Sequence, residues 1–504
     1  MQVQIAVIDF GSQYTQLIVR RVRELGYFAK LFQPAELQEV GQPAAVILSG
    51  GPRSVTETDA PDIDYAFLEG LKVPVLGICY GMQLLNLKHG GEVAPSHSRE
   101  YGPAQLEPSE STGLFANLSD SSQIWMSHSD TVSNLPESTK VLGKNQEGIP
   151  VALSWREGWY GIQFHPEVTH SHEGTQVLKN FLEMTNDPPR FEIQSFRDET
   201  IAALKEEIGD REVICGVSGG VDSTVLAVLL KRAGSRVRPI FVDNGLLRKG
   251  ESDQVLESFK QLDLEIERVD ARDRFLDALA GEEDPEKKRH IIGNLFLDVF
   301  WDAAKDVQLL AQGTLYPDVI ESATSGSIAS RIKTHHNRVD RILELQKEGR
   351  VIEPLAELFK DEVRALGKSL DIPDEMLFRH PFPGPGLAVR VPGEITEDRL
   401  KIVREADAVF IGNLRKHGWY DKVWQAYAAL LPVRTVGVKG DERSYEHAIA
   451  LRAVISEDAM TADWVELPHA LLRETSNTIL NTVSGVNRVF YDISTKPPAS
   501  IELE

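Results

Sequence analysis

The sequence predicts an α/β protein in which two doubly wound parallel-sheet domains precede a small α+β C-terminal domain. Short apolar runs that end in polar turns alternate with helical patterns, as in parallel sheets covered by helices. The adjacent prolines Pro188 and Pro189 interrupt this alternation, and the Pro/Gly-rich stretch 380–387 interrupts it again. We therefore expect three domains, at 1–187, 191–383 and 384–504.

The composition restricts the class of protein. A chain of 504 residues suggests about three domains. The net charge of −22 argues against a protein that coats nucleic acid, although small nucleotides need only a local positive pocket. No apolar run approaches the roughly 18 residues of a membrane span, and 1–9 is typical of a first strand rather than a signal peptide. Two cysteines, Cys79 and Cys215, supply neither a disulfide framework nor a zinc site, which fits a cytoplasmic protein.

The first domain carries a possible nucleophile at a strand end. Apolar runs predict strands at 3–10, 44–48, 74–78 and 159–164, and apolar spacing predicts a helix at 15–25. The third strand leads into Gly77-Ile-Cys79-Tyr-Gly81, which has the spacing of a nucleophile elbow with cysteine in place of serine. The flanking glycines relieve crowding at the sharp turn, and a helix N-terminus favours the thiolate of Cys79.

A base for this thiol is predicted at the end of the fourth strand, in His165-Pro-Glu167. His165 can take and return the proton, and Glu167 can orient the imidazole. The alternative is that Cys79 is an ordinary small buried residue.

Three segments, 50–52, 77–83 and 165–167, resemble class I glutamine amidotransferases. By that resemblance, Cys79 attacks the side-chain amide of glutamine, water then frees glutamate, and ammonia is the useful product. His165 and Glu167 complete the catalytic triad.

The same resemblance assigns residues that bind the substrate. The N–H groups of Gly51 and Tyr80 are expected to form the oxyanion hole, and Gln83 is expected to help hold the glutamine. The sequence leaves three alternatives for His128: it helps to bind glutamine, it closes an interface, or it lies in a surface loop.

A second motif, Ser218–Thr224, lies between an apolar strand at 213–217 and a helix starting near 225. Such a turn points several backbone N–H groups and the positive end of the helix dipole at one spot, so it can hold phosphate. The motif lacks the Gly-Lys-Ser/Thr of the Walker loop and resembles the loop of the N-type ATP pyrophosphatases. That family cuts ATP between its α- and β-phosphates and adenylates an oxygen of a second substrate. An ordinary Gly-rich turn is the alternative.

Further strands at 237–243, 266–271 and 307–313 complete a nucleotide site along one sheet edge. Asp243 ends the first of them and can meet a ribose or an adenine. Lys333 and Lys360 are candidates to neutralise phosphate, with a solvated basic face as the alternative. Mg²⁺ is expected to be held by the phosphates, with Asp222 as a partner. The predicted ATP-binding residues are Ser218, Gly219, Gly220, Val221, Asp222, Ser223, Thr224, Asp243, Lys333 and Lys360.

The last third combines a shaped loop with a small α+β unit. The stretch 380–387 is too rich in proline and glycine for a helix or an inner strand. Helices are expected at 397–411, 445–453 and 464–482, and strands at 432–438 and 488–493. The apolar strand at 433–438 suggests a surface for self-association.

The order of these motifs, the 380–387 loop and the ending Lys496-Pro-Pro resemble the GMP synthetase family over nearly the whole chain. The resemblance implies that ATP adenylates the C2 oxygen of xanthosine monophosphate (XMP), and that ammonia from glutamine displaces AMP to give GMP. It implies a homodimer and assigns XMP contacts to Arg390, Lys496 and Glu502. Two places depart from the family pattern: Leu503 replaces a usual tryptophan, and Arg-Val-Asp at 338–340 replaces Val-Gly-Gly.

Two other functions are compatible with the same motifs. One keeps both sites but adenylates a different acceptor, such as the carboxylate of an NAD or asparagine precursor. The other is a non-catalytic sensor of nucleotide or glutamine that carries a relic elbow, against which the intact Cys79, His165 and Glu167 argue.

Overall fold

The computed structural model describes residues 3–185, 190–324, 342, 344–439, 442–456 and 461–504. The chain forms two compact units, unit 1 (Met1–Phe196) and unit 2 (Arg197–Glu504). Helix α5 (Ile193–Ile208) contains the junction between them. Among the described helices, none combines the length and the apolarity that crossing a bilayer requires.

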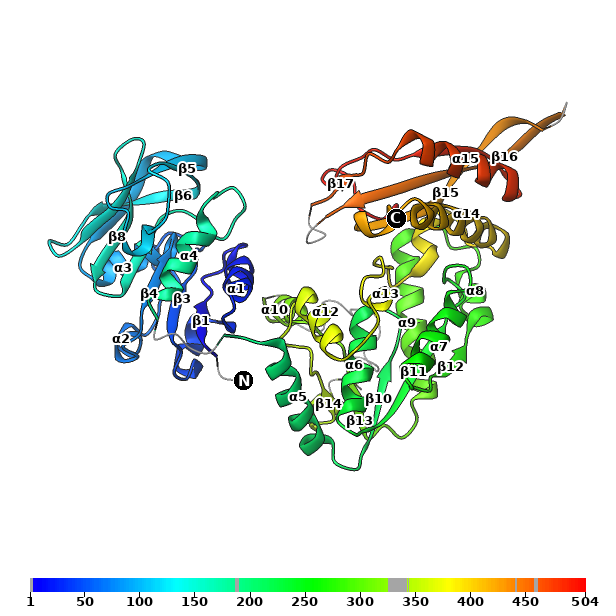
Figure 1. The fold of residues 1–504 in the computed structure, drawn as a ribbon, viewed down its shortest axis with the longest axis horizontal. Helices are drawn as coiled ribbons and strands as arrows, with labels where there is room; N and C mark the ends of the chain where they lie inside the picture. The colour runs from blue at the N-terminus through cyan, green and yellow to red at the C-terminus, as the bar shows by residue number, and fades with distance from the viewer. Residues whose placement is uncertain (1–2, 186–189, 325–341, 343, 440–441, 457–460) are drawn as a thin grey trace. The chain divides into compact units, whose positions relative to one another are not determined.

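Unit 1 is built on a nine-stranded sheet in the order β2-β1-β3-β4-β9-β8-β7-β5-β6 (Figure 1, blue to cyan). The first five strands in this order (β2, β1, β3, β4 and β9) run parallel. The remaining strands, β8, β7, β5 and β6, are joined by antiparallel pairing. Strands β1, β3 and β4 are buried along their whole lengths, as inner parallel strands covered on both faces should be.

The bounds of the strands in unit 1 are β1 (Ile5–Ile8), β2 (Ala29–Phe32), β3 (Ala45–Leu48), β4 (Val75–Ile78), β5 (Glu92–Pro108), β6 (Ser122–Asn134), β7 (Lys140–Asn145), β8 (Pro150–Arg156) and β9 (Trp159–Ile162). Its α-helices are α1 (Thr15–Glu24), α2 (Tyr65–Gly70), α3 (Tyr80–Lys88) and α4 (Gly174–Glu183), and its 3₁₀ helices are η1 (Pro34–Glu39) and η2 (Gly113–Phe115). The four strands and the helix expected from the sequence are all present, within a few residues of their expected bounds.

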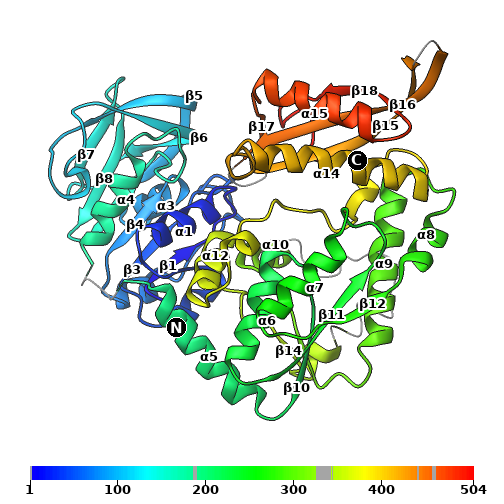
Figure 2. The ribbon, with the colours of Figure 1, turned by 45° about the vertical axis from the view of Figure 1, so that its right-hand side comes forward.

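Unit 2 contains a parallel five-stranded sheet in the order β12-β11-β10-β13-β14 and a second sheet of four strands. In the second sheet, β16 pairs antiparallel with β15 and β17 and parallel with β18. Helices α14 and α15 pack side by side against this sheet (Figure 2, amber to red).

The bounds of the strands in unit 2 are β10 (Glu212–Gly216), β11 (Arg236–Asp243), β12 (Glu267–Asp270), β13 (Leu309–Ala311), β14 (Val351–Ile352), β15 (Gln425–Lys439), β16 (Glu442–Ile455), β17 (Asp463–Trp464) and β18 (Val486–Tyr491). The helices are α6 (Val221–Arg232), α7 (Glu251–Gln261), α8 (Arg272–Leu279), α9 (Pro285–Ala303), α10 (Tyr316–Thr324), α12 (Lys360–Ser369), α13 (Asp374–Leu377), η3 (Gly386–Arg390), α14 (Glu397–Lys416), η4 (Tyr420–Lys422) and α15 (His469–Thr482).

The two sheets of unit 2 share one apolar core. A single cluster of buried side chains contains Ile214 and Ile240 of the five-stranded sheet, Leu387 of the Pro/Gly-rich loop, and Val403 and Ile449 of the C-terminal part. The loop at 380–387 therefore joins two packed layers. The predicted fold class is confirmed, because parallel sheets dominate and a β-rich part with two long helices closes the chain.

One predicted helix is wrong. Residues 445–453 lie in β16, between β15 and β18, where they are buried over most of their length. A strand with neighbours on both sides and helices packed on its sheet need not alternate between apolar and polar residues, so its alanine-rich sequence imitated a helix. The helix expected from 464 begins at His469, after Pro468, because 463–464 pair with β16.

The turn from β4 into α3 is packed so closely that two of its residues leave no room for a side chain. A Cβ atom on Gly77 would lie 2.6 Å from the backbone of Gly81. A Cβ atom on Gly81 would lie 2.5 Å from the carbonyl oxygen of Leu48. Because backbone atoms of α3 and of the neighbouring strand β3 cannot move aside cheaply, both positions require glycine.

We expect Gly81→Ala to lower the free energy of unfolding of unit 1 by about 1–3 kcal/mol or more, because the added methyl group overlaps backbone. The control is Gly70→Ala at the end of α2, where a Cβ atom would meet nothing within 4 Å. The control should match the wild type or gain slightly from better helix propensity. Urea unfolding followed by circular dichroism measures both; equal midpoints for the two variants would contradict the steric argument.

Candidate functional site

The backbone at Cys79 is held in an unusual conformation. Cys79 connects β4 to α3 with φ 52° and ψ −102°, a combination that residues other than glycine rarely adopt. Its N–H donates to the carbonyl of Ile162 over 2.7 Å, and its carbonyl accepts from the N–H of Gln83 over 3.1 Å. The turn thus holds the thiol at the carboxyl ends of the parallel strands, as expected for a nucleophile elbow.

His165 and Glu167 lie at the end of β9, the strand next to β4. The Nδ1 of His165 is 2.7 Å from Oε1 of Glu167, and both side chains are buried. Burial by itself lowers the pKa of His165, but the charge of Glu167 and hydrogen bonds to Cys79 and Glu167 outweigh it and raise the pKa well above its ordinary value. The imidazole can therefore retain the proton that the thiol gives up.

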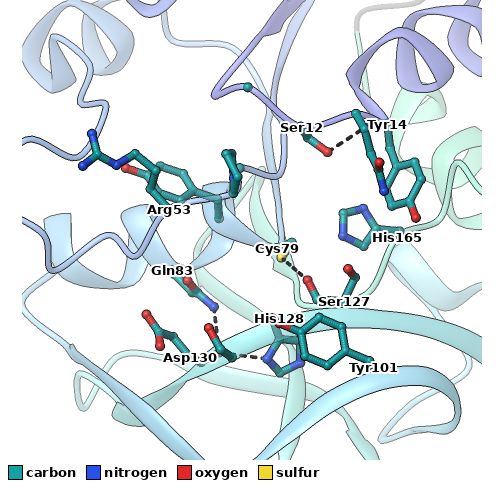
Figure 3. Close-up of a pocket in the computed structure, with 16 residues that line it drawn as sticks. Ser12, Tyr14, Arg53, Cys79, Gln83, Tyr101, Ser127, His128, Asp130 and His165 are labelled. Carbon is teal, nitrogen blue, oxygen red and sulfur yellow. Dashed lines mark hydrogen bonds between the residues drawn. The ribbon is translucent and has the colours of Figure 1, made fainter.

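Cys79 and His165 open onto a cavity of about 330 Å³ (Figure 3). The predicted binding residues Gly51, Tyr80 and Gln83 line the same cavity. Gly51 and Tyr80 are close neighbours in the cavity wall: a Cβ atom added to Gly51 would lie 3.2 Å from the ring of Tyr80. The structure thus brings together the triad's Cys79 and His165 with all three residues assigned to glutamine binding. The lining residues are Gly11, Ser12, Gln13, Tyr14, Gly51, Pro52, Arg53, Cys79, Tyr80, Gln83, Tyr101, Ser127, His128, Ser129, Asp130 and His165.

A pair of buried glutamines lies behind the sulfur. The amide nitrogen of Gln83 donates to the carbonyl of Asp130 over 2.8 Å and to Oε1 of Gln163 over 3.2 Å. The amide nitrogen of Gln163 donates to Sγ of Cys79 over 3.5 Å. Gln163 belongs to none of the sequence motifs, although a polar residue inside the apolar run 159–164 is a usable signal.

His128 lies in β6 and lines the cavity (Figure 3), so the surface-loop alternative is wrong. Its Nδ1 bonds the carbonyl of Asp130 at 2.9 Å, and its Nε2 is 3.0 Å from Oε2 of Glu100. Burial lowers the pKa of His128 to about 4, so the ring is neutral at pH 7. A neutral ring with Nδ1–H donated to a carbonyl presents Nε2 as an acceptor, and Glu100, whose pKa is raised by burial, can donate to it when protonated.

In unit 2, the Ser218–Thr224 loop connects β10 to α6, the place where a phosphate-binding turn was expected. Gly219 has φ +72°, and a Cβ atom there would lie 2.4 Å from the side chain of Val255. The hydroxyl groups of Ser218 and Ser223 gather beside the N–H of Gly220, which donates to Ser218 Oγ over 3.3 Å. These groups are bonded to one another within the segment, beside the N-terminus of α6 at the edge of the sheet. Val221, Asp222 and Thr224 form the first turn of α6.

Arg379 fixes the direction of one peptide in this loop. It donates one N–H to the carbonyl of Gly219 over 2.9 Å and another to the buried Glu251 over 2.7 Å. The carbonyl and the following N–H of a trans peptide point in opposite directions, so this bond turns the Gly220 N–H toward the serine hydroxyl groups. The contact of Arg379 with this loop could not be predicted from the sequence, since 160 residues separate Arg379 from Gly219.

Asp222 and Lys360, both predicted from the sequence, form an ion pair. The second carboxylate oxygen of Asp222, Oδ1, is buried and has no hydrogen-bond partner among the described residues. Such an oxygen suits a hard cation such as Mg²⁺. Among the described residues, no group of three or more His, Cys, Asp or Glu side chains could hold a metal ion alone, so phosphate oxygens would have to supply most of the ligands.

The remaining predicted ATP residues are placed differently. Asp243 is buried at the end of β11, where one carboxylate oxygen accepts from Arg268 over 2.6 Å and the other from the N–H of Gly245 over 3.2 Å. Its carboxylate is thus already bonded to an arginine of β12. Lys333 and the 338–340 departure lie outside the described residues.

The C-terminal segment is anchored by buried cations. Arg390, which is fully buried, bonds both carboxylate oxygens of Glu502, at 3.0 and 2.9 Å. Lys288 bonds Glu504 over 2.8 Å, and Arg452 bonds the carbonyls of 500 and 501. The backbone of Lys496 pairs with Ala462. Two of the three predicted XMP contacts, Arg390 and Glu502, are therefore bonded to each other, and Lys496 lies in the same terminal segment.

Three family models match parts of this chain. The family model "Glutamine amidotransferase class-I" matches 6–184, "tRNA methyl transferase HUP domain" matches 211–278, and "GMP synthase C terminal domain" matches 412–503. A solved glutamine amidotransferase from Thermotoga maritima is 19% identical and aligns with 36% of this chain and 97% of that chain, with a TM-score of 0.31. The elbow, the triad and the first of these matches define unit 1 as a class I glutamine amidotransferase domain.

Relatives match over the whole chain, and two of them serve as examples. The GMP synthase (glutamine-hydrolyzing) of Christiangramia forsetii is 52% identical, covering 100% of both chains. That of Thermosipho africanus is 51% identical, covering 99% of both. The chain belongs to the family of glutamine-hydrolysing GMP synthases.

Because His128 is neutral in the folded chain, the free energy of unfolding should depend on pH. The folded pKa of about 4 lies below the ordinary 6.5, so the unfolded chain binds a proton in this window and the folded chain does not. The free energy of unfolding should therefore fall by about 2 kcal/mol between pH 7 and pH 5 because of this group. Denaturant unfolding of the wild type and of His128→Gln measures it.

The variant should lose that part of the pH dependence, because a glutamine does not titrate. The exposed His172→Gln is the control and should keep the wild-type difference between pH 7 and pH 5. An identical pH dependence for wild type and His128→Gln would show that the ring is not held neutral.

Proposed function

We propose that this chain makes GMP from XMP, ATP and the amide nitrogen of glutamine. The observation that carries the proposal is the strained elbow, which places the thiol of Cys79 between His165 and a cavity of amino-acid size in a chain that belongs to the GMP synthase family. The proposal assigns glutamine hydrolysis to 1–187, adenylation to 191–383, and dimerisation with nucleotide-substrate binding to 384–504.

In the glutaminase half, the Cys79 thiolate attacks the carboxamide carbon of glutamine. The N–H groups of Gly51 and Tyr80 stabilise the oxyanion that forms there. His165, held by Glu167, gives its proton to the leaving ammonia and then takes a proton from the water that hydrolyses the thioester to glutamate. Its raised pKa fits the first of these steps, since the ring must carry the proton when ammonia leaves.

Gln83 is assigned to substrate binding through its carbonyl oxygen. Both hydrogens of its amide are directed at the Asp130 carbonyl and at Gln163, so the oxygen is the group it can offer to a ligand. An acceptor at this place suits an N–H donor of the substrate glutamine.

In the adenylating half, the loop 218–224 binds the β- and γ-phosphates of ATP through backbone N–H groups and the hydroxyls of Ser218 and Ser223. Lys360 and Lys333 balance phosphate charge in a chain whose net charge is −22. Asp222 would hold Mg²⁺ together with the phosphates, and the ion would then neutralise charge on the leaving pyrophosphate. Asp243 is the proposed contact to the nucleoside of ATP.

XMP binding is assigned to Arg390, Lys496 and Glu502. Lys496 is a cation able to balance the monophosphate. Arg390, which is fully buried, would act through Glu502, whose carboxylate it holds and which can accept hydrogen bonds from the N–H groups of a purine. The adenylated C2 oxygen then leaves with AMP when ammonia attacks C2, which gives GMP. Both cysteines are free, which is why the proposal places the protein in the reducing cytoplasm.

We expect Cys79→Ala to abolish GMP formation from glutamine and to leave formation from added ammonia close to the wild-type rate. The alanine variant lacks the nucleophile that attacks glutamine, whereas the adenylating half of the chain does not contain Cys79. A product assay with XMP, ATP, Mg²⁺ and either glutamine or ammonia measures both rates. The control is Cys215→Ala, which should keep both activities because Cys215 lies in the core of unit 2.

Other results of this assay would point elsewhere. Equal loss of both activities in Cys79→Ala would contradict two separate sites. Pyrophosphate release that requires a carboxylate acceptor instead of XMP would assign a different adenylated substrate. Glutamine protection of Cys79 against alkylation without any turnover would support a sensor.

A homodimer formed through the C-terminal sheet is part of the proposal. Val436 and Val438 of β15 and Tyr445 of β16 are exposed, and Val436 lies directly opposite Tyr445. Phe490 of β18 is also exposed. Exposed apolar side chains on one sheet suit a self-complementary interface between two copies.

We expect Val436→Asp combined with Val438→Asp to convert the dimer to a monomer, because two charges would be buried in the interface. Sedimentation velocity measures the change. Val319→Asp, at an exposed valine of α10, is the control and should leave the dimer intact. A wild type that sediments as a monomer at micromolar concentration would exclude this interface.

A further inference from the structure

Gln163 is a polar side chain where the sequence favours an apolar one. It follows β9 inside an apolar run, and only 2% of its surface is exposed. Its backbone N–H bonds the carbonyl of Val151, so the strand does not depend on the side chain. A buried amide costs free energy unless its groups are bonded, and within the described residues this amide bonds Gln83 on one side and Cys79 on the other.

The orientation of both amides follows from one carbonyl group. The carbonyl oxygen of Asp130 can only accept, so the atom of Gln83 that lies 2.8 Å from it must be the nitrogen. That nitrogen directs its second hydrogen at Gln163, over 3.2 Å, so the facing atom there must be the oxygen. The nitrogen of Gln163 is then the atom beside the sulfur, over 3.5 Å.

An N–H group in this place acts on the charge of the sulfur. A thiolate is a much stronger acceptor than a thiol, and a hydrogen bond to the charged form favours that form. The neutral thiol has another contact, because Sγ lies 3.8 Å from the carbonyl oxygen of Ser127, to which an S–H can donate. Ser127 therefore favours the thiol and Gln163 favours the thiolate. His165 contributes charge from another direction (Figure 3).

We propose that Gln163 is a catalytic residue of the glutaminase reaction, which donates its amide N–H to the sulfur of Cys79 and stabilises the thiolate that attacks glutamine. The same bond stabilises the thiolate when it leaves the thioester during hydrolysis. Gln83, anchored on Asp130, acts as a positioning residue that keeps the Gln163 nitrogen toward the sulfur. This inference rests on the proposed glutaminase function, but it concerns a contact that exists without substrate.

The test is the pH profile of Cys79 alkylation by iodoacetamide in the full chain. Cys215 does not interfere, because burial raises its pKa to about 12. In Gln163→Met, which has a similar shape and no donor, we expect the midpoint of the profile to rise by about one pH unit or more. Gln163→Glu should raise it further, because a carboxylate then lies beside the sulfur. Gln105→Glu, at an exposed glutamine of β5, is the control and should keep the wild-type midpoint.

Activity separates a catalytic role from a structural one. Both Gln163 variants should lose about tenfold or more in glutamine hydrolysis at pH 7 and keep GMP formation from ammonia. Unchanged alkylation midpoints in both variants would overturn the proposal. A variant that no longer gives the wild-type circular dichroism spectrum is set aside and the other decides; failure of both to fold would make Gln163 structural and also overturn it.

Failure of the proposed function would look different. A wild type that forms no GMP from either nitrogen source would remove the GMP synthase proposal. The alkylation profile would still report whether Gln163 acts on Cys79, because that measurement needs neither glutamine nor ATP.

Discussion

The backbone conformation of Cys79 is the constraint on which the amidotransferase site depends. A residue with a side chain is held at φ 52°, so the packing around it must supply the free energy that this conformation costs. The packing comes from Gly77 and Gly81, whose missing Cβ atoms let α3 lie directly on the ends of β3 and β4. His165 reaches the sulfur only because β9 is the neighbour of β4 in the sheet. A small change in strand spacing would therefore separate the thiol from its base.

In unit 2, two ion pairs with one buried member each fix distant segments to one another. Arg379 joins the segment 218–224 to the buried Glu251, and the buried Arg390 joins η3 to Glu502 of the terminal segment. Such pairs add little net stability, because desolvation costs about as much as the attraction returns. Their effect is to specify one arrangement, since a misplaced partner would leave a buried charge without compensation. The loop and the terminal segment, which contain few apolar residues, acquire defined positions by this means.

Sequence-based reasoning was wrong or undecided where the surroundings of a residue depend on the tertiary structure. The segment 445–453 was assigned to a helix because its alanines and its continuous burial hide the period of two that identifies a strand. His128 was left undecided because only the sheet places β6 beside the cavity. Asp243 stays a predicted nucleoside contact, but nothing near it in sequence indicates that Arg268 of the neighbouring strand also bonds it.

The sequence by itself determined the fold class and the motifs at the two strand ends, among them Cys79, His165 and Glu167, the predicted triad. These features are encoded within a few neighbouring residues, as apolar periodicity, turn glycines and fixed spacing, so they can be read without a structure. Only the tertiary structure decided which side chains meet: Gln163 with Cys79 across 84 residues, and Arg379 with Gly219 across 160. Such contacts arise when strand order and packing bring distant segments together, and no local pattern in the chain records that order.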